Sequence, residues 1–320
     1  MRVICPNPTI DRLVLLGELM PGRVDRAREN QSHPAGKSVS AARGVRANGV
    51  QPDVRVLLPE QGSPWYLDTA AAEGLALREH LVPGTVRESI IVLEDSGRVS
   101  VLNGTGAEVA PADWTAFVES SLAGLDAGEW VVCSGSFPPG VGLAAVGSLA
   151  AQVAEAGGRL AMDSGPGWLS AALSEPVLPD LISPNLAEAE SLLSGRIGPE
   201  STSVEADALA RAEVAARRLR GLGITSVVVT AGAAGVAWAD PDGAGTLAAL
   251  PVTVSNPIGA GDAFLGGLMA RLERGERFAD AVAWGMATAS AAIEQYCPGA
   301  ADPARVLVHR EAIEKAARGS

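Results

Sequence analysis

The residues best suited to chemistry lie in the run Asn-Pro-Ile-Gly-Ala-Gly-Asp at positions 256–262. Alternating β-branched residues precede this run and apolar residues at helical spacing follow it, which predicts a strand, a glycine turn and the start of a helix. The first N–H groups of a helix lack intrahelical partners and carry the positive end of its dipole, so they favour an anion such as a phosphate. Asp262 would lie in the first helical turn, where carboxylates also serve as N-caps or dipole partners.

Other polar residues follow segments that read as buried strands. Asn7 and Asp11 belong to a proline-punctuated loop after the apolar residues 2–5, and Ser-Gly-Ser at 134–136 follows another apolar segment. Loops at the carboxyl ends of parallel strands line the ligand crevice of open α/β sheets, although a structural turn would explain residues 134–136 equally well. Asn185 and Glu188, at the start of an expected helix, would share one face.

Composition narrows the classes of function. The 320 residues are 47% hydrophobic and 19% charged, which is ordinary for a globular protein with one large core. A net charge of −12 repels polyanions, so we expect no nucleic-acid partner. No apolar run is long enough to span a membrane and no signal-peptide pattern opens the chain. We therefore expect a cytoplasmic protein without a membrane partner.

The cysteines and histidines are few and scattered. Cys5, Cys133 and Cys297 have neither disulfide nor metal-site spacing, and suit reduced thiols packed in a core. Three equally dispersed histidines give no basis for a zinc site or a histidine-based nucleophile relay.

Two patterns of predicted structure divide the chain. Short alternating segments at residues 12–16, 23–29, 87–93 and 98–102 predict strands that stand apart, with a turn entering a helix at 33–45. From residue 107 onward, strands alternate with helices, which predicts a parallel sheet with helices on both faces.

Four motifs, in this order, carry a family resemblance: Asn-Pro-x-Ile-Asp at 7–11, Ser-Gly-Ser-x-Pro-Pro-Gly at 134–140, Pro-Asn-x-x-Glu at 184–188 and the run at 256–262. Together they resemble the ribokinase/PfkB carbohydrate kinases, in particular the 1-phosphofructokinase and tagatose-6-phosphate kinase branch. The resemblance covers essentially the whole chain. It implies one α/β, ribokinase-like domain over residues 1–320, with a mainly parallel sheet and a small β-sheet lid formed by about 11–32 and 86–103. It also implies a homodimer through that lid.

The resemblance assigns the transfer chemistry and the nucleotide site. Asp262 would be the base that takes the proton of the acceptor hydroxyl, and the backbone of Gly259, Ala260 and Gly261 would form the anion hole. ATP and Mg²⁺ are the implied cofactors, with Glu188 supporting the metal through water, although a helix-capping box would use the same spacing. The nucleotide-binding residues would be Asn185, Thr230, Gly232 and Gly235. A tight hairpin would explain the two glycines equally well.

The same resemblance places an acceptor sugar under the lid. A buried phosphate on that sugar would need charge-assisted partners, for which Lys37 and Arg87 are the candidates. The segment at 35–40 departs from the family's Gly-Gly-Lys-Gly-x-Asn at Ala35, Ser38 and Ser40. The implied acceptor-binding residues are Asn7, Asp11, Gly36, Lys37, Ser40 and Arg87.

These features predict an ATP-dependent kinase that acts on a ketohexose phosphate, best matched by fructose 1-phosphate. The altered segment leaves two alternatives open, a kinase for an unphosphorylated sugar or nucleoside and a non-catalytic sugar-phosphate sensor. Retention of Asp262 with both neighbouring glycines speaks against the sensor. Neither the oligomeric state nor a monovalent-ion requirement nor the adenine contacts follow from the sequence.

Overall fold

Alternate residues of the buried strands enter two different cores, one on each face of a large sheet. In the computed structural model, which describes residues 1–195 and 206–319, Val3 packs into one core and its neighbour Ile4 into the other. Because successive side chains of a strand point to opposite faces, a continuous apolar run requires cover on both sides. The strands of this sheet are β1 (Arg2–Cys5), β4 (Asp53–Gln61), β5 (Leu77–Thr85), β8 (Trp130–Ser134), β9 (Arg159–Asp163), β10 (Leu181–Ile182), β11 (Ser226–Thr230), β12 (Gly235–Asp240) and β13 (Gly243–Ala248).

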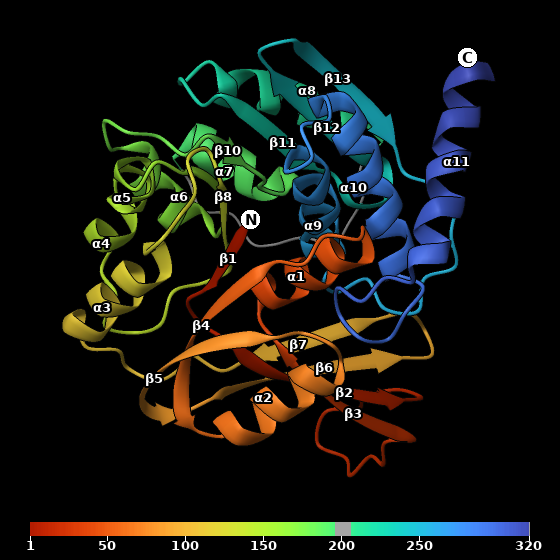
Figure 1. Ribbon diagram of the computed structural model, residues 1–320. Helices are drawn as coiled ribbons and strands as arrows, with labels where there is room; N and C mark the ends of the chain where they lie inside the picture. Colours follow the sequence, from red (N-terminus) through yellow and green to blue (C-terminus); the bar gives the residue numbers. More distant parts are fainter. Residues whose placement is uncertain (196–205, 320) are drawn as a thin grey trace.

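Helices supply that cover (Figure 1). On one face lie α1 (Lys37–Ala47), α2 (Ser63–Ala72), α9 (Ala260–Leu272), α10 (Phe278–Ala292) and α11 (Pro303–Gly319). On the other face lie α3 (Pro111–Leu122), α4 (Leu143–Gly147), α5 (Leu149–Glu155), α6 (Pro166–Leu173), α7 (Leu186–Ser194) and α8 (Ala208–Arg220). No helix of the described residues is long and apolar enough to cross a membrane.

The strand order places a topological switch point beside β1. The order is β13-β12-β11-β10-β9-β8-β1-β4-β5, and every pairing from β11 to β5 is parallel. The chain therefore runs outward from β1 through β4 and β5, and later outward through β8, β9, β10 and β11. In such sheets, ligands bind in the crevice at the carboxyl ends of the strands where the direction reverses, here between β1 and β8. The predicted fold class is confirmed.

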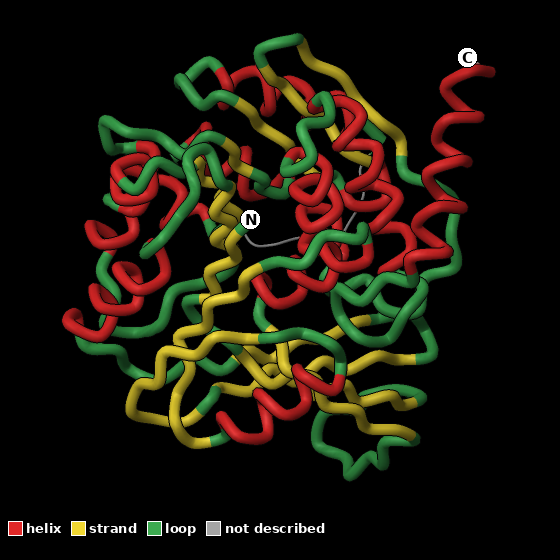
Figure 2. Tube along the Cα trace, in the orientation of Figure 1, coloured by secondary structure: helices red, strands yellow, loops and turns green. Residues whose placement is uncertain are grey.

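A second, four-stranded sheet lies below α1 and α9 in Figures 1 and 2. It contains β2 (Thr9–Leu16), β3 (Glu29–Ala35), β6 (Arg87–Glu94) and β7 (Val99–Asn103), in the order β3-β2-β6-β7. Its own small apolar cluster comprises Leu13, Leu15, Ile91 and Leu93. Ile258, from the loop before α9, packs against that cluster, so the small sheet contacts the glycine turn directly.

Two strand predictions were wrong. Residues 250–255, which precede the glycine turn and were expected to form a strand, are irregular. Residues 23–28 form no strand, and β3 instead begins at Glu29 and continues to Ala35, where the sequence predicted a turn. The alternation at 23–28 had nothing to bury, since Val24 is 86% exposed. Pro34 is tolerated because β3 is an edge strand, where a missing N–H leaves no ladder bond unmade.

Close packing of α1 against α9 holds the starts of both helices near the switch point. A Cβ added to Gly266 would lie 2.2 Å from the carbonyl oxygen of Ala41, and one added to Gly44 would lie 2.8 Å from that of Ala263. Reciprocal glycines therefore let the two backbones touch. Lys37 and Asp262 both lie in the first turns of these helices, so their relative position depends on this contact.

We expect Gly266→Ala to destabilise the protein by about 3 kcal/mol, because the added methyl group meets backbone atoms that cannot move alone. Gly167→Ala on α6 is the matched control, since a Cβ there meets nothing within 4 Å. Urea unfolding measures both free energies. Equal midpoints for the two variants would contradict the close-packing argument.

Candidate active site

A side-chain contact joins the loops that follow β1 and β8, the two strands at the switch point. Asn7, which follows β1, donates from Nδ2 to Oγ of Ser136, which follows β8, at 3.1 Å. Ser38 links the same two strands. Its Oγ donates to the Ile4 carbonyl oxygen of β1 at 2.6 Å and accepts from Ser134 N of β8 at 3.0 Å. Ser38, one of the residues that depart from the family motif, therefore stabilises the backbone on which the crevice is built.

Lys37 faces the carboxyl ends of the neighbouring strands. Its Nζ lies 3.4 Å from Oδ1 of Asp163, the last residue of β9, and its side chain is 42% exposed. Ser134 donates from Oγ to Oδ2 of the same carboxylate at 3.2 Å. The cation predicted to meet the acceptor thus has a partner in the protein that sequence reasoning missed.

Asp163 could have been found from the sequence. It is a carboxylate at the end of an apolar strand segment that follows the helical stretch after residues 134–140. Neighbouring parallel strands end at the same edge of a sheet, so this position lies beside residues 134–136. It belongs to none of the four family motifs.

The glycine turn before α9 has the predicted form. Gly259 is the N-cap of the helix with φ of 82°, and a Cβ on it would lie 2.6 Å from Gly299 N. A Cβ on Gly261 would meet nothing within 4 Å, so the backbone there is approachable. Asn256 fixes the turn by accepting from Ile258 N at 3.0 Å and donating to the Tyr296 carbonyl oxygen at 2.7 Å.

Asp262 lies in the first turn of α9, and its side chain is only about 8% exposed. Its pKa is raised to about 8, chiefly by burial; the charge of Lys37 lowers it, whereas the nearby carboxylates of Asp163, Asp11 and Glu188 raise it. A buried carboxyl group whose pKa is close to neutral is suited to accepting a proton from a reacting hydroxyl.

The pKa values of two other charged groups in the crevice, Lys37 and Asp11, are also raised. Lys37 is partly exposed, and the partial loss of water around its ammonium opposes the charge, but Asp163, Asp262 and Glu188 prevail and raise its pKa above the ordinary value. Burial raises the pKa of Asp11 to about 6, against the lowering effect of Arg43 and Arg87. These shifts show that the predicted base and acceptor residues share one electrostatic environment.

The nucleotide-side residues fall into two groups. Asn185 forms an isolated parallel bridge with Thr230, so these two lie side by side at the ends of β10 and β11. Gly232 has open space where a Cβ would be, whereas a Cβ on Gly235 would lie 2.1 Å from the Leu247 carbonyl oxygen. Gly235 is therefore needed by the hairpin of β12 and β13.

Glu188 forms the capping box that the spacing also suggested. Glu188 N donates to Asn185 Oδ1 at 2.9 Å, and Asn185 N donates to Glu188 Oε2 at 2.8 Å. The side chain is about 4% exposed and still acts electrostatically on Lys37 and Asp262. Glu188 therefore caps α7 and also lies close enough to Asp262 to influence its charge.

Of the remaining acceptor-side residues, Arg87 and Gly36 contact the segment that contains Asn7, and Ser40 lies against another loop. Arg87 donates from Nη2 to the Asn7 carbonyl oxygen at 3.0 Å and from Nη1 to that of Gly104 at 3.1 Å. Gly36 packs on the segment before β2, since a Cβ there would lie 3.2 Å from Cys5 Sγ. Ser40 is buried against Gly299.

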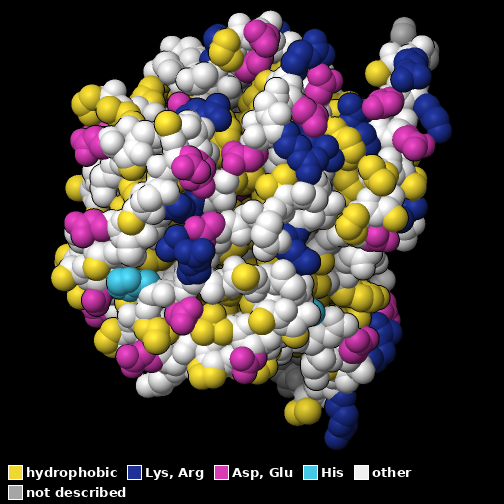
Figure 3. All heavy atoms as spheres, in the orientation of Figure 1, with side chains coloured by type: hydrophobic (Ala, Val, Ile, Leu, Met, Phe, Trp, Pro, Cys, Tyr) yellow, Lys and Arg dark blue, Asp and Glu magenta, His cyan; other side chains and the backbone are white. Residues whose placement is uncertain are grey.

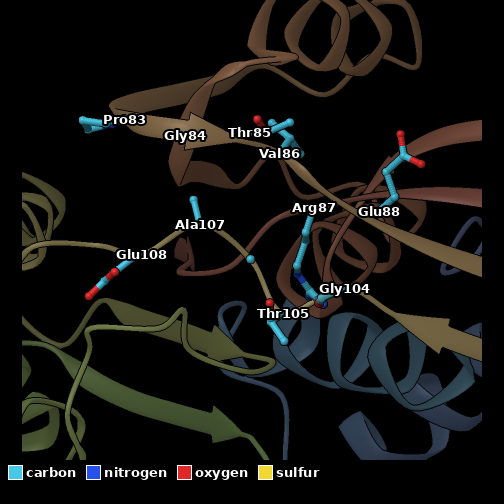
Figure 4. Close-up of a pocket in the computed structure, with 11 residues that line it drawn as sticks. Pro83, Gly84, Thr85, Val86, Arg87, Glu88, Gly104, Thr105, Ala107 and Glu108 are labelled. Atoms are coloured by element: carbon cyan, nitrogen blue, oxygen red, sulfur yellow. The ribbon is translucent and has the colours of Figure 1, made fainter.

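A pocket of about 580 Å³ opens between residues 83–88 and 104–108, and Arg87 lines it (Figure 4). The figure shows the Arg87 side chain directed from β6 toward Gly104 and Thr105. The pocket lies beside the start of β6 in the small sheet, and Asp262 is not among the residues that line it.

Charges on the visible surface are mixed. In Figure 3, Lys and Arg side chains alternate with Asp and Glu side chains and form no continuous basic face. A phosphate would therefore be attracted by the local groups of the crevice.

Comparison with known proteins agrees with this geometry. A model of the pfkB family of carbohydrate kinases matches residues 9–305. The 1-phosphofructokinase of Escherichia coli (strain K12) is 30% identical over 296 residues, which are 92% of this chain and 91% of that protein. The crystal structure of phosphofructokinase-2 from Escherichia coli in complex with potassium has a TM-score of 0.86 at 22% identity, covering 98% of this chain and 99% of that chain.

A crystal structure of ribokinase from Thermotoga maritima has the same fold, with a TM-score of 0.69 at 17% identity and 98% coverage of both chains. The family suggested by the four motifs is thus confirmed by the family model and by the full-length relative. This chain belongs to the pfkB family of carbohydrate kinases.

Proposed function

We propose that this carbohydrate kinase transfers the γ-phosphoryl group of ATP to the free primary hydroxyl of fructose 1-phosphate. The observation that carries the transfer chemistry is the buried carboxyl of Asp262, in the first turn of a glycine-capped helix that opens on the switch-point crevice. The acceptor is suggested by the relatives named 1-phosphofructokinase, one of which matches 92% of this chain.

Asp262 would take the proton of the acceptor hydroxyl as that oxygen attacks the γ-phosphorus. The bond from the γ-phosphorus to the bridging oxygen of ATP breaks, and ADP leaves with the electron pair. Backbone N–H groups at Gly259, Ala260 and Gly261 would face the oxygens of the transferring group, where the helix dipole favours negative charge. Positioning and charge stabilisation account for most of such catalysis.

Glu188 and Asn185 are the residues we assign to Mg²⁺, with Glu188 acting through water. They fit because buried carboxylates converge on this part of the crevice, and hard oxygen ligands are those magnesium prefers. When bound, the ion would neutralise charge on the nucleotide phosphates. The capping box fixes the Glu188 side chain at the helix start, so it lies ready to hold a metal-bound water.

The nucleotide would lie along the ends of β10 and β11. Thr230 and Asn185 are adjacent there, and Gly232 leaves room for close approach. Gly235 would contribute through the hairpin that it permits.

The acceptor would lie between Asn7, Asp11 and the starts of α1 and α9. Asp11 is a buried carboxylate on β2 and would accept from sugar hydroxyls. Gly36 and Ser40 would shape the floor of the site, whereas Lys37 and Arg87 would meet the phosphate of the sugar. Both cations have protein partners that a phosphate could share or replace.

We also assign the small sheet to a homodimer interface and to the cover of the acceptor. Ile90 and Leu102 form a cross-strand pair on its outer face and are 39% and 57% exposed. A second copy would bury this apolar pair, so sedimentation of the protein as a monomer at micromolar concentration would contradict the interface.

We expect ATP consumption with fructose 1-phosphate in a panel that also contains other ketohexose phosphates, aldohexose phosphates, free sugars and nucleosides. Asp262→Asn should lower kcat by at least about 100-fold, because the general base is lost. Asp280→Asn is the matched control, since this aspartate occupies the first turn of α10 and is paired with Arg277 at the surface. Coupled assay of ADP release measures all three proteins.

Turnover confined to an unphosphorylated acceptor would contradict the proposed substrate. Equal activity of the wild type and Asp262→Asn would contradict the proposed base. No turnover with any member of the panel would favour a sugar-phosphate sensor.

The pH dependence of kcat/KM should report the shifted pKa of Asp262. The carboxyl group accepts a proton only when ionised, so kcat/KM should fall as the pH drops below about 8. Lys37→Met removes a charge that lowers this pKa, so the acidic limb of the pH profile should move to higher pH by about one unit. Asp163→Asn removes a charge that raises it, and should move the limb to lower pH. Shifts of the same sign in both variants would refute the assignment.

Arg87→Ala should raise the KM for fructose 1-phosphate by about 10-fold or more, because a charged hydrogen bond to the phosphate is lost. Arg12→Ala is the matched control, since that arginine pairs with Glu88 on the exposed face of the same sheet. Steady-state kinetics across sugar concentrations measures both. An unchanged KM in Arg87→Ala would exclude a phosphate contact and favour an unphosphorylated acceptor.

A further inference from the structure

Three side chains from distant parts of the chain meet beside the acceptor region. His33 lies on β3, Glu73 immediately follows α2, and Cys297 lies in the loop between α10 and α11. One ligand atom from each, an imidazole nitrogen, a carboxylate oxygen and the thiol sulfur, lies within 4.8 Å of the other two. Sequence spacing gave no sign of this cluster, and the predicted core role holds for Cys5 and Cys133 but not for the half-buried Cys297.

The chemistry of the three groups matches a tetrahedral metal ion. Nitrogen, sulfur and carboxylate oxygen are the ligands of zinc sites, at bond lengths of about 2.0–2.3 Å, which place ligand atoms roughly 3.3–3.8 Å apart. His33 Nδ1 and Glu73 Oε1 are already 3.0 Å apart. Side-chain adjustments of about 1 Å would bring the thiol into the same coordination sphere.

Neighbouring side chains already orient two of the ligands. His33 Nε2 lies 3.2 Å from Gln31 Oε1, an acceptor that would hold the proton on this nitrogen and leave Nδ1 for the cluster. Arg43 donates from Nε and Nη2 to Oε2 of Glu73, so Oε1 is the oxygen presented to His33 and Cys297. Such outer partners are characteristic of metal-ligating histidines and carboxylates.

We propose that His33, Glu73 and Cys297 form a binding site for a zinc-type divalent cation, with water as the fourth ligand. A thiolate and a carboxylate balance the two charges of the ion. All three ligand residues are partly exposed, so the ion can enter from solvent.

The site would clamp segments that shape the crevice. Tyr296, next to Cys297, accepts from Asn256 through its carbonyl oxygen. Gly299 packs against both Gly259 and Ser40. A bound ion would therefore tie the small sheet and the end of α2 to the loop that supports the glycine turn.

Titration of the full-length, reduced protein with Co²⁺ tests the site, because a thiolate ligand gives an intense near-ultraviolet charge-transfer band that oxygen ligands do not give. We expect one such Co²⁺ per chain, displaced by Zn²⁺, and a higher Tm with Zn²⁺. Cys297→Ser should abolish the band, and Gln31→Leu should weaken Co²⁺ binding by at least about tenfold. His80→Gln is the matched control, since His80 lies on β5, packs against Phe117 and is not a member of the cluster, and this variant should bind as the wild type does.

Absence of the charge-transfer band in the wild type would overturn the proposal, as would its persistence in Cys297→Ser. His33→Ala provides a second variant should Cys297→Ser fail to fold, and an unchanged affinity for Co²⁺ in His33→Ala would equally overturn it. The readout is independent of phosphoryl transfer, so its outcome is separate from that of the proposed function.

Discussion

The constraint on which the site depends is the crowding of buried carboxylates around one lysine. Asp11, Asp163 and Glu188 all raise the pKa of Asp262, and burial raises it further. Burial of several like charges is unfavourable unless they are paired, and Lys37 is the cation that acts most strongly on Asp262. A base with a pKa near the working pH accepts protons efficiently, so the arrangement suits the role that we propose for Asp262. A divalent ion and its nucleotide would complete the charge balance.

That crowding is a consequence of the topology. Asn7 follows β1, and Ser134 and Asp163 are the last residues of the parallel strands β8 and β9. All three strands end at the same edge of the sheet, at and beside the point where the strand order reverses. Asp262 and Lys37 come from helices whose glycine contacts bring their first turns to that edge. No single element forms the site, so the strand order and the α1–α9 packing are as necessary to it as the charged residues.

Sequence reasoning reached the family and the fold, and led to the proposed base, because all three rest on local patterns. A glycine turn at a helix start can be recognised in a short stretch of sequence, and so can apolar strands separated by helices. Sequence analysis missed Asp163 because its place beside the crevice depends on the strand order. It missed the cluster of His33, Glu73 and Cys297 because residues far apart in the sequence meet there only through tertiary packing. The strand at 23–29 was wrong because alternation indicates a strand only where one face has a core to meet.

The contacts of the segment at 35–40 explain two of the positions at which it departs from the family motif. Ser38 hydrogen-bonds to the backbones of β1 and β8, so its hydroxyl stabilises the crevice from beneath and does not meet the acceptor. Ser40 packs against Gly299 in the loop that also contacts Gly259. Two of the three departures thus bear on the support of the site. Because Asn7, Asp11, Lys37 and Arg87 all remain at the crevice, a family activity on a phosphorylated sugar is compatible with a motif that is only half preserved.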